Sequence, residues 1–266
     1  MVLPIHDDNP VRRAPVVTYL LIALNVGIFL LTPVARDPFG HQQTVASVCA
    51  QTTFFDRYAA IPRELLTNRQ LARRPVGIRT DQGVVPCPVV RYMKIPVASV
   101  LFAMFLHGGW LHLLGNMLFL YVFGNNVEDR LGRLWYLGFY LICGYVATYA
   151  FALSDPNSTT TLVGASGAIA GVLGGYLVLY PRARITSIVP PLFFLPFRLP
   201  AWVVLGFWFV LQYWYSARAA ASSGAGVAYL AHVAGFLVGG LLVWPLRQRR
   251  TPPPPPPYPQ TWRAGY

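Results

Sequence analysis

The sequence is poor in charge, and above all in acidic residues. Only 11% of its 266 residues are charged and Asp and Glu together number 9, whereas a soluble domain carries about 25% charged residues. Residues 156–266 contain no acidic residue at all. With 55% hydrophobic residues and a mean hydropathy of +0.47, the composition predicts a protein that uses the lipid bilayer as its solvent.

Several chemical classes are excluded by what the chain lacks. It has no His-Glu-x-x-His motif and no metal-ligand spacing, so we expect no zinc protease, no metal site and no cofactor. No Asp or Glu lies within an apolar run, which excludes an aspartyl mechanism. The net charge is +12, but the basic residues mark the loops between apolar runs, so nucleic acid is not an expected partner.

The sequence contains only three cysteines. Cys49 and Cys87 lie in the long segment after the first apolar run, and Cys143 lies inside a later run. Cys49 and Cys87 form a disulfide if that segment faces an oxidising compartment. The sequence alone leaves the pairing open.

Long apolar runs are what the chain does have. We predict six membrane spans, at residues 16–31, 95–123, 134–153, 163–180, 201–215 and 227–246. Residues 1–15 form a polar leader with no cleavable signal, residues 247–266 a proline-rich tail, and residues 185–200 an interfacial connection. The arginine distribution places both termini in the cytoplasm. The fold class is therefore an all-α membrane protein with six transmembrane helices.

The connection at residues 32–95 is unusually long, and loops of this length commonly carry structure or function of their own. Its aromatic residues Phe54, Phe55 and Tyr58 suggest helices lying at the membrane surface. A partly ordered external insertion is the alternative.

The fourth span has a glycine face with a serine at its start. Gly167, Gly171 and Gly175 recur every fourth residue, so they share one side of a helix and let another backbone approach closely. Ser166 stands where a helix N-terminus supplies free backbone N–H groups. Alternatively, Ser166 is a packing residue.

The sixth span has its own small face at Gly235 and Gly239, preceded by His232. Packing the two small faces together would bring His232 against Ser166, and an imidazole is a natural base for a serine nucleophile. The alternative is a histidine bonded to a neighbouring carbonyl.

Two further polar residues, His112 and Asn116, lie four positions apart on one helix face in the second span. Both can donate hydrogen bonds to a developing oxyanion. His107 lies about 140° around the helix from His112, so we expect it to have a structural role.

Together these motifs resemble the rhomboid family of intramembrane serine proteases. The resemblance is carried by His107, His112 and Asn116 in the second span, by Gly164-Ala165-Ser166-Gly167, and by Ala231-His232-Val233-Ala234-Gly235. It implies a six-helix bundle whose cavity opens externally, and substrates that are single-pass membrane proteins in the lipid bilayer. Some members carry an aromatic residue four positions after the nucleophile, where this chain has Ala170.

The resemblance also implies a role for each residue. Ser166 would be the nucleophile and His232 the general base, and the oxyanion hole would comprise His112, Asn116 and the Ser166 backbone N–H. Gly164 and Gly167 would allow substrate approach, residues 216–226 would form a lid, and the fifth span would act as a lateral gate. We expect a multi-pass protein of a bacterial plasma membrane. The alternatives are a catalytically inactive rhomboid-like protein that binds membrane clients and a small transporter or channel.

Overall fold

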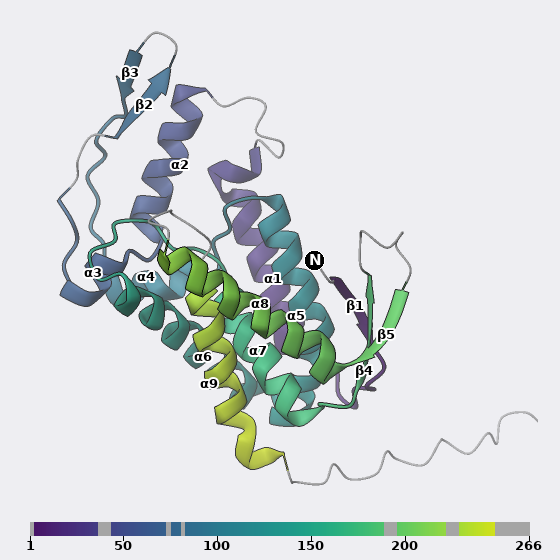
Figure 1. Ribbon diagram of the computed structural model, residues 1–266. Coiled ribbons are helices and arrows are strands. Elements are labelled where there is room, and N and C mark those ends of the chain that lie inside the picture. The colour runs from purple at the N-terminus through teal and green to yellow at the C-terminus, as the bar shows by residue number, and fades with distance from the viewer. Residues whose placement is uncertain are drawn as a thin grey trace, which may run out of the picture.

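The computed structural model describes residues 3–36, 44–72, 76–80, 83–188, 196–221 and 229–247. Figure 1 shows a mainly helical molecule with two small sheets. The α-helices are α1 (Val16–Leu31), α2 (Val45–Tyr58), α3 (Pro62–Thr67), α4 (Pro96–Ala103), α5 (Trp110–Leu131), α6 (Arg133–Ser154), α7 (Ser166–Leu179), α8 (Ala201–Ala221) and α9 (Tyr229–Val243). The strands are β1 (Leu3–Asp7), β2 (Gly77–Thr80), β3 (Gly83–Pro86), β4 (Arg184–Ile188) and β5 (Pro196–Pro200), and two 3-10 turns are η1 (Pro33–Arg36) and η3 (Trp244–Leu246).

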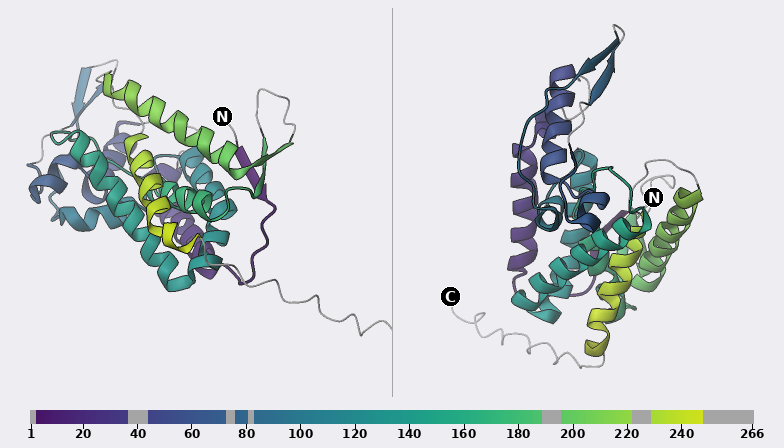
Figure 2. Two further views of the ribbon diagram at one scale, coloured as in Figure 1. Left: turned by 60° about the horizontal axis from the view of Figure 1, so that its bottom comes forward. Right: turned by 90° about the vertical axis from the view of Figure 1, so that its left-hand side faces the viewer.

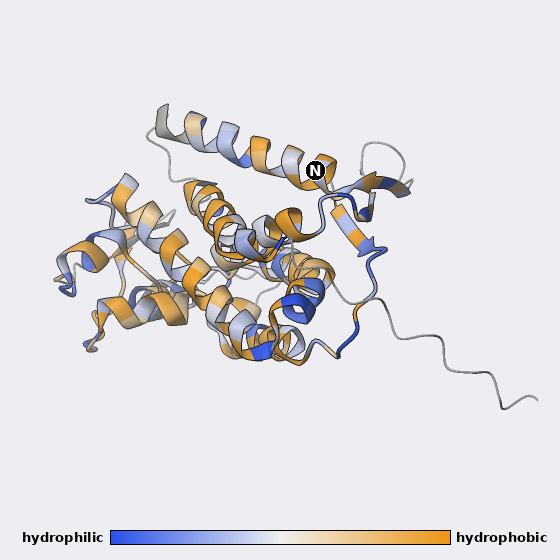
Figure 3. Cartoon of the chain, turned by 90° about the horizontal axis from the view of Figure 1, so that it is seen from below, coloured by the Kyte–Doolittle hydropathy of each residue, from blue (hydrophilic) through white to orange (hydrophobic). Residues whose placement is uncertain are grey.

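Six of the helices, α1 and α5 to α9, correspond to the six predicted spans, and we call them the helical bundle. Among the described residues, two helical segments, Arg133–Ser154 and Tyr229–Leu246, are long and apolar enough to cross a membrane, and Val16–Leu31 and Ser166–Leu179 are shorter apolar helices. In Figure 3 the bundle helices are largely hydrophobic, and the connection after β1 is hydrophilic. The count of six spans stays a prediction.

Helix α7 forms the centre of the bundle. Its residues from Ala168 to Tyr176 are all buried, and a helix that is hydrophobic on every side is one that other helices surround. It packs against α5, α6, α8 and α9.

Helices α7 and α9 meet through their small faces, as the glycine pattern predicts. A Cβ added at Gly239 would overlap the backbone of Gly171, and one added at Gly235 would overlap the backbone oxygen of Gly167. A Cβ at Gly174 would likewise overlap the Phe236 carbonyl. No other residue type allows two helix backbones to come this close.

The second predicted span is not a single helix. Residues 104–109 separate α4 from α5, and α5 then continues to Leu131, beyond residue 123 where the predicted span ends. Gly124 lies within α5 and does not break it; a Cβ there would crowd Thr18 and Tyr136 in the core, so the position needs glycine for packing. The break comes at Gly132, whose φ of 79° favours glycine.

This longer α5 brings an acidic residue into the bundle, which corrects the expectation that no span contains one. Glu128 is buried, and its carboxylate accepts hydrogen bonds from the Val17 and Thr18 backbone N–H groups at 2.9 and 2.7 Å. A carboxylate at a helix N-terminus satisfies orphan donors and the helix dipole. Glu128 therefore caps α1.

The all-α prediction did not include the sheets. Strands β1, β4 and β5 form an antiparallel sheet in that order, which draws on the predicted leader and the predicted interfacial connection; residues 189–195 lie outside the described residues. Asp7, the last residue of β1, is buried, and its carboxylate accepts hydrogen bonds of 2.7 Å from the Tyr176 hydroxyl and the Asn126 amide. Burial raises the pKa of the Asp7 carboxyl from its ordinary value.

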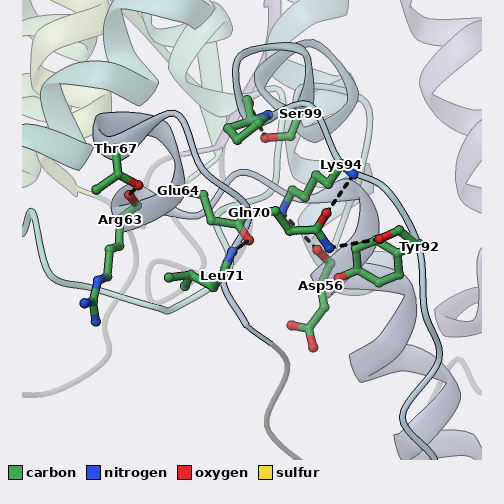
Figure 4. A network of polar contacts seen from close by, with 10 residues as sticks. Asp56, Arg63, Glu64, Thr67, Gln70, Leu71, Tyr92, Lys94 and Ser99 are labelled. Atoms are coloured by element: carbon green, nitrogen blue, oxygen red, sulfur yellow. Dashed lines mark hydrogen bonds and ion pairs between the residues drawn. The ribbon is translucent and has the colours of Figure 1, made fainter.

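The long connection forms a substructure that we call the loop module, the described residues from 44 to 95. It contains α2, α3 and the β2–β3 hairpin, and a disulfide joins Cys49 to Cys87. A buried ion pair of 2.7 Å joins Lys94 to Glu64 (Figure 4). Figures 1 and 2 place the loop module and the β1-β4-β5 sheet on opposite sides of the bundle.

Candidate active site

Ser166 is the first residue of α7, and the segment that precedes it is held on both sides. The Gly164 N–H donates to the Ala103 carbonyl at 2.9 Å, and Leu162 exchanges two backbone hydrogen bonds with Ala60 of the loop module. Gly164 has a φ of 124°, a conformation that side chains rarely adopt. The chain therefore enters α7 with little freedom, and the position of the Ser166 side chain is well defined.

His232 lies beside Ser166. Its Nε2 atom is 2.8 Å from the Ser166 hydroxyl oxygen, although the two residues are 66 positions apart. The close packing of α7 on α9 brings them together, because His232 lies one helical turn before Gly235 and Ser166 lies next to Gly167. Both residues are partly buried, and so is the contact between them.

The other ring nitrogen of His232 is also occupied, by a residue that the sequence analysis missed. The Gln212 side-chain oxygen is 2.8 Å from Nδ1, and Gln212 is on α8, which runs along one edge of the bundle in Figure 2. One signal was available: Gln212 is an amide within a predicted span, and polar groups in spans are costly enough to suggest function.

Trp208, one turn before Gln212 on α8, lies beside the same imidazole. The two ring centroids are 6.1 Å apart and the planes are inclined by 35°. Ala170, where some rhomboids carry an aromatic residue, contributes no ring to this site. Helix α8 thus supplies both an amide and an aromatic neighbour to His232.

His112 approaches the site from the start of α5. A Cβ added at Gly164 would lie 2.8 Å from His112 Nε2 and 3.5 Å from the Ser166 hydroxyl oxygen. Because Gly164 has no side chain, these two groups can both approach this point. The Gly108 N–H donates to His112 Nδ1 over 3.4 Å. With Nδ1 accepting, the ring proton resides on Nε2, and this N–H faces Gly164.

Asn116 lies one turn beyond His112 on α5 and is buried. Its side-chain nitrogen has no hydrogen-bond partner within the described parts of the chain, which is unusual for a buried donor. An unpaired donor one turn along the helix from His112 is suited to a group that arrives with a ligand.

Gly167 and His107, which the sequence analysis also singled out, lie in packed positions. A Cβ added at Gly167 would lie 2.7 Å from the Ala147 Cβ of α6, so Gly167 lies in the contact of α7 with α6 and α9, and the substrate approach assigned to it stays a prediction. His107 is fully buried, in the turn before α5, with its ring 5.1 Å from that of His112.

The remaining expectations concern the lid and metals. Of the predicted lid at residues 216–226, residues 216–221 belong to α8, and residues 222–226 lie outside the described residues. Within the described ranges, no group of three or more His, Cys, Asp or Glu side chains is placed to hold a metal ion.

Known proteins similar to this chain point to one family. Residues 96–249 match the family model described as the Rhomboid domain. Rhomboid protein 1, mitochondrial, of Saccharomyces cerevisiae is 31% identical over 164 residues, which cover 57% of this chain and 44% of the relative. Rhomboid-like protein 11, chloroplastic, of Arabidopsis thaliana is 31% identical over 153 residues, covering 54% and 50%.

A shorter match is more similar. RHOMBOID-like protein 5 of Arabidopsis thaliana is 39% identical over 72 residues, 27% of this chain and 23% of the relative. This chain therefore spans half or less of the length of these three curated relatives.

Proposed function

Because the chain belongs to the rhomboid family, we propose that it is an intramembrane serine endopeptidase, with Ser166 as nucleophile and His232 as general base. The observation that carries this proposal is the 2.8 Å separation of His232 Nε2 from the Ser166 hydroxyl. This is the hydrogen-bond distance that a base needs to take the serine proton during attack.

The reaction proceeds through an acyl-enzyme. The Ser166 oxygen attacks the scissile carbonyl carbon while its proton passes to His232 Nε2. When the C–N bond breaks, His232 returns that proton to the leaving amine. A water molecule then attacks the ester, again with His232 as base, and releases the second product together with free Ser166.

The negative charge on the carbonyl oxygen needs donors that are already oriented. Three hydrogen-bond donors are candidates for this role: the His112 Nε2–H, the Asn116 amide and the Ser166 backbone N–H. The last is one of the backbone donors in the first turn of α7 that have no partner within the helix. Removing one such donor typically costs a hundred- to a thousandfold in kcat, about 2.7–4 kcal/mol. We expect losses of this size for His112→Ala and Asn116→Ala.

The proposed setting is a membrane that α1 and α5 to α9 cross, with both termini cytoplasmic and the site near the external surface. The substrates are single-pass membrane proteins. A transmembrane helix hides its carbonyls in its own hydrogen bonds, so the substrate must unwind near the cut. Gly164 keeps the space beside Ser166 open for this strand. A bacterial plasma membrane is the location that we propose.

The test uses the purified chain in liposomes with a tagged single-pass substrate. Wild type should cleave it and Ser166→Ala should not, whereas Ser154→Ala, at the end of α6, serves as a matched serine control and should cleave normally. A fluorophosphonate probe should label wild type and not Ser166→Ala. Equal cleavage by wild type and Ser166→Ala would contradict the assignment, and an unlabelled, inactive wild type would favour the client-binding alternative.

A further inference from the structure

Both ring nitrogens of His232 are engaged, but by different kinds of group. Nε2 faces the Ser166 hydroxyl and Nδ1 faces the Gln212 side-chain oxygen, each at 2.8 Å. The three residues come from three helices, α7, α8 and α9. A Ser–His–Gln chain of hydrogen bonds therefore runs across the bundle.

The amide oxygen determines which nitrogen of His232 carries the proton. A carbonyl oxygen only accepts hydrogen bonds, so its partner Nδ1 must be the protonated nitrogen of the neutral ring. The Nε2 lone pair then points at the Ser166 hydroxyl, as a general base requires. The other tautomer would present an N–H to Ser166 and would be unable to take its proton.

Unlike a carboxylate, the Gln212 side chain carries no charge. It orients the imidazole but does not neutralise the imidazolium that forms when the serine proton is taken. Among the residues that the structure describes, the other titratable side chains around His232 are His112 on α5 and Tyr229 on α9, whose ring centroid is 6.4 Å away. Neither of them is a carboxylate.

Helix α8 also contacts the His232 imidazole through a second residue, Trp208. The Trp208 ring packs beside the imidazole and also against Phe236, one turn beyond His232, with centroids 6.0 Å apart. Trp208 and Gln212 are four residues apart, so they lie on one face of α8. If this face moved away from α9, His232 would lose both contacts together.

We propose that Gln212 is a positioning residue that fixes the tautomer and orientation of His232, so that the base is competent only while α8 is packed against α9. This inference rests on the proposed serine protease function. Gln212 acts through His232 and not on the substrate, so its loss should lower kcat and leave KM unchanged.

The experiment compares wild type, Gln212→Leu and Gln212→Glu, with Tyr213→Phe as an exposed control on the same helix. For each, kcat, KM and the pH profile are measured in liposomes, together with the melting temperature and the rate of fluorophosphonate labelling. Gln212→Leu should lose about ten- to a hundredfold in kcat, because the Nδ1–H is left unpaired. Tyr213→Phe should match wild type.

Gln212→Glu is the decisive variant, because it keeps the shape and the acceptor oxygen but adds a negative charge. It should retain kcat within about tenfold of wild type, and the acid limb of its kcat/KM profile should move to higher pH, because a carboxylate stabilises the imidazolium. A residue with a merely structural role would not move this limb.

Two results would overturn the inference. One is a wild-type kcat in Gln212→Leu. The other is an unchanged acid limb in Gln212→Glu, which remains informative even if Gln212→Leu folds poorly. Failure of the proposed function is distinguishable, because it appears as wild type and Ser166→Ala behaving alike.

Discussion

The helical bundle and the loop module are stabilised by different interactions. In the bundle, α7 and α9 approach until only glycine fits between their backbones, at Gly174, Gly235 and Gly239. In the loop module, short helices and a hairpin are joined by a disulfide and by the buried Lys94–Glu64 ion pair. Lipid provides no hydrophobic force between helices, so close packing must hold them. Short segments outside such a core bury too little apolar surface to be stable alone, and a covalent link such as a disulfide commonly supports them.

The largest effect should come from breaking the close packing. In Gly239→Ala the new methyl group would lie 2.6 Å from the Gly171 Cα atom, and neither helix backbone can move aside cheaply. We expect a loss of about 3 kcal/mol or more in the free energy of unfolding, and loss of cleavage because α9 carries His232. Denaturant unfolding in detergent and the liposome assay measure both.

A glycine without close neighbours provides the control. A Cβ at Gly138 on α6 would meet no described atom within 4 Å, so Gly138→Ala should be neutral or slightly stabilising, since Ala favours a helix over Gly. Equal destabilisation by both substitutions would show that packing between α7 and α9 is not what holds the bundle.

The next effect concerns the buried ion pair of the loop module. Lys94 and Glu64 side chains are 2% and 4% exposed, so Lys94→Met leaves a buried carboxylate without its counter-charge. We expect a local loss of about 3 kcal/mol, seen as faster hydrogen exchange in α3, with the bundle unchanged.

The double variant Lys94→Met/Glu64→Leu tests the cause of that loss. It should recover much of the stability, because both charges leave together. If the double variant is no better than Lys94→Met alone, packing of the lysine stem, and not the unpaired charge, accounts for the loss.

The smallest of the three effects should come from the disulfide. Cys49 and Cys87 are 38 positions apart, and opening the loop they close should cost about 2 kcal/mol. Cys49→Ser/Cys87→Ser should loosen α2 and the hairpin in a limited-proteolysis experiment. Cys143→Ser, in the bundle, is the control and should leave the proteolysis pattern of the loop module unchanged.

Much of the bundle was predictable, because apolar runs and small residues at helical spacing depend only on nearby sequence. The glycine faces of the fourth and sixth spans predicted that α7 and α9 would pack, and with that contact Ser166 and His232 meet. The sequence left the pairing of Cys49 and Cys87 open, and the structure shows the disulfide.

Other features depended on partners far away in the chain. In the sequence, Glu128 lies between two predicted spans, whereas in the structure α1 places two backbone N–H groups against its carboxylate. The leader and the 184–200 region pair as strands although about 180 residues separate them. Gln212 was missed because no local pattern says which neighbour a side chain on α8 will face.

The sequence by itself indicated that this protein lies in a lipid bilayer, where its apolar helices are, and which helix faces carry residues small enough for close packing. These follow from composition and from a period of 3.6 residues, which are local properties. Only the tertiary structure decided that an amide from α8 holds the imidazole, that His112 turns its Nε2 toward Gly164 and that Asp7 is buried against Tyr176 and Asn126. Such contacts join segments that are remote in the chain, so they exist only once the helices have packed.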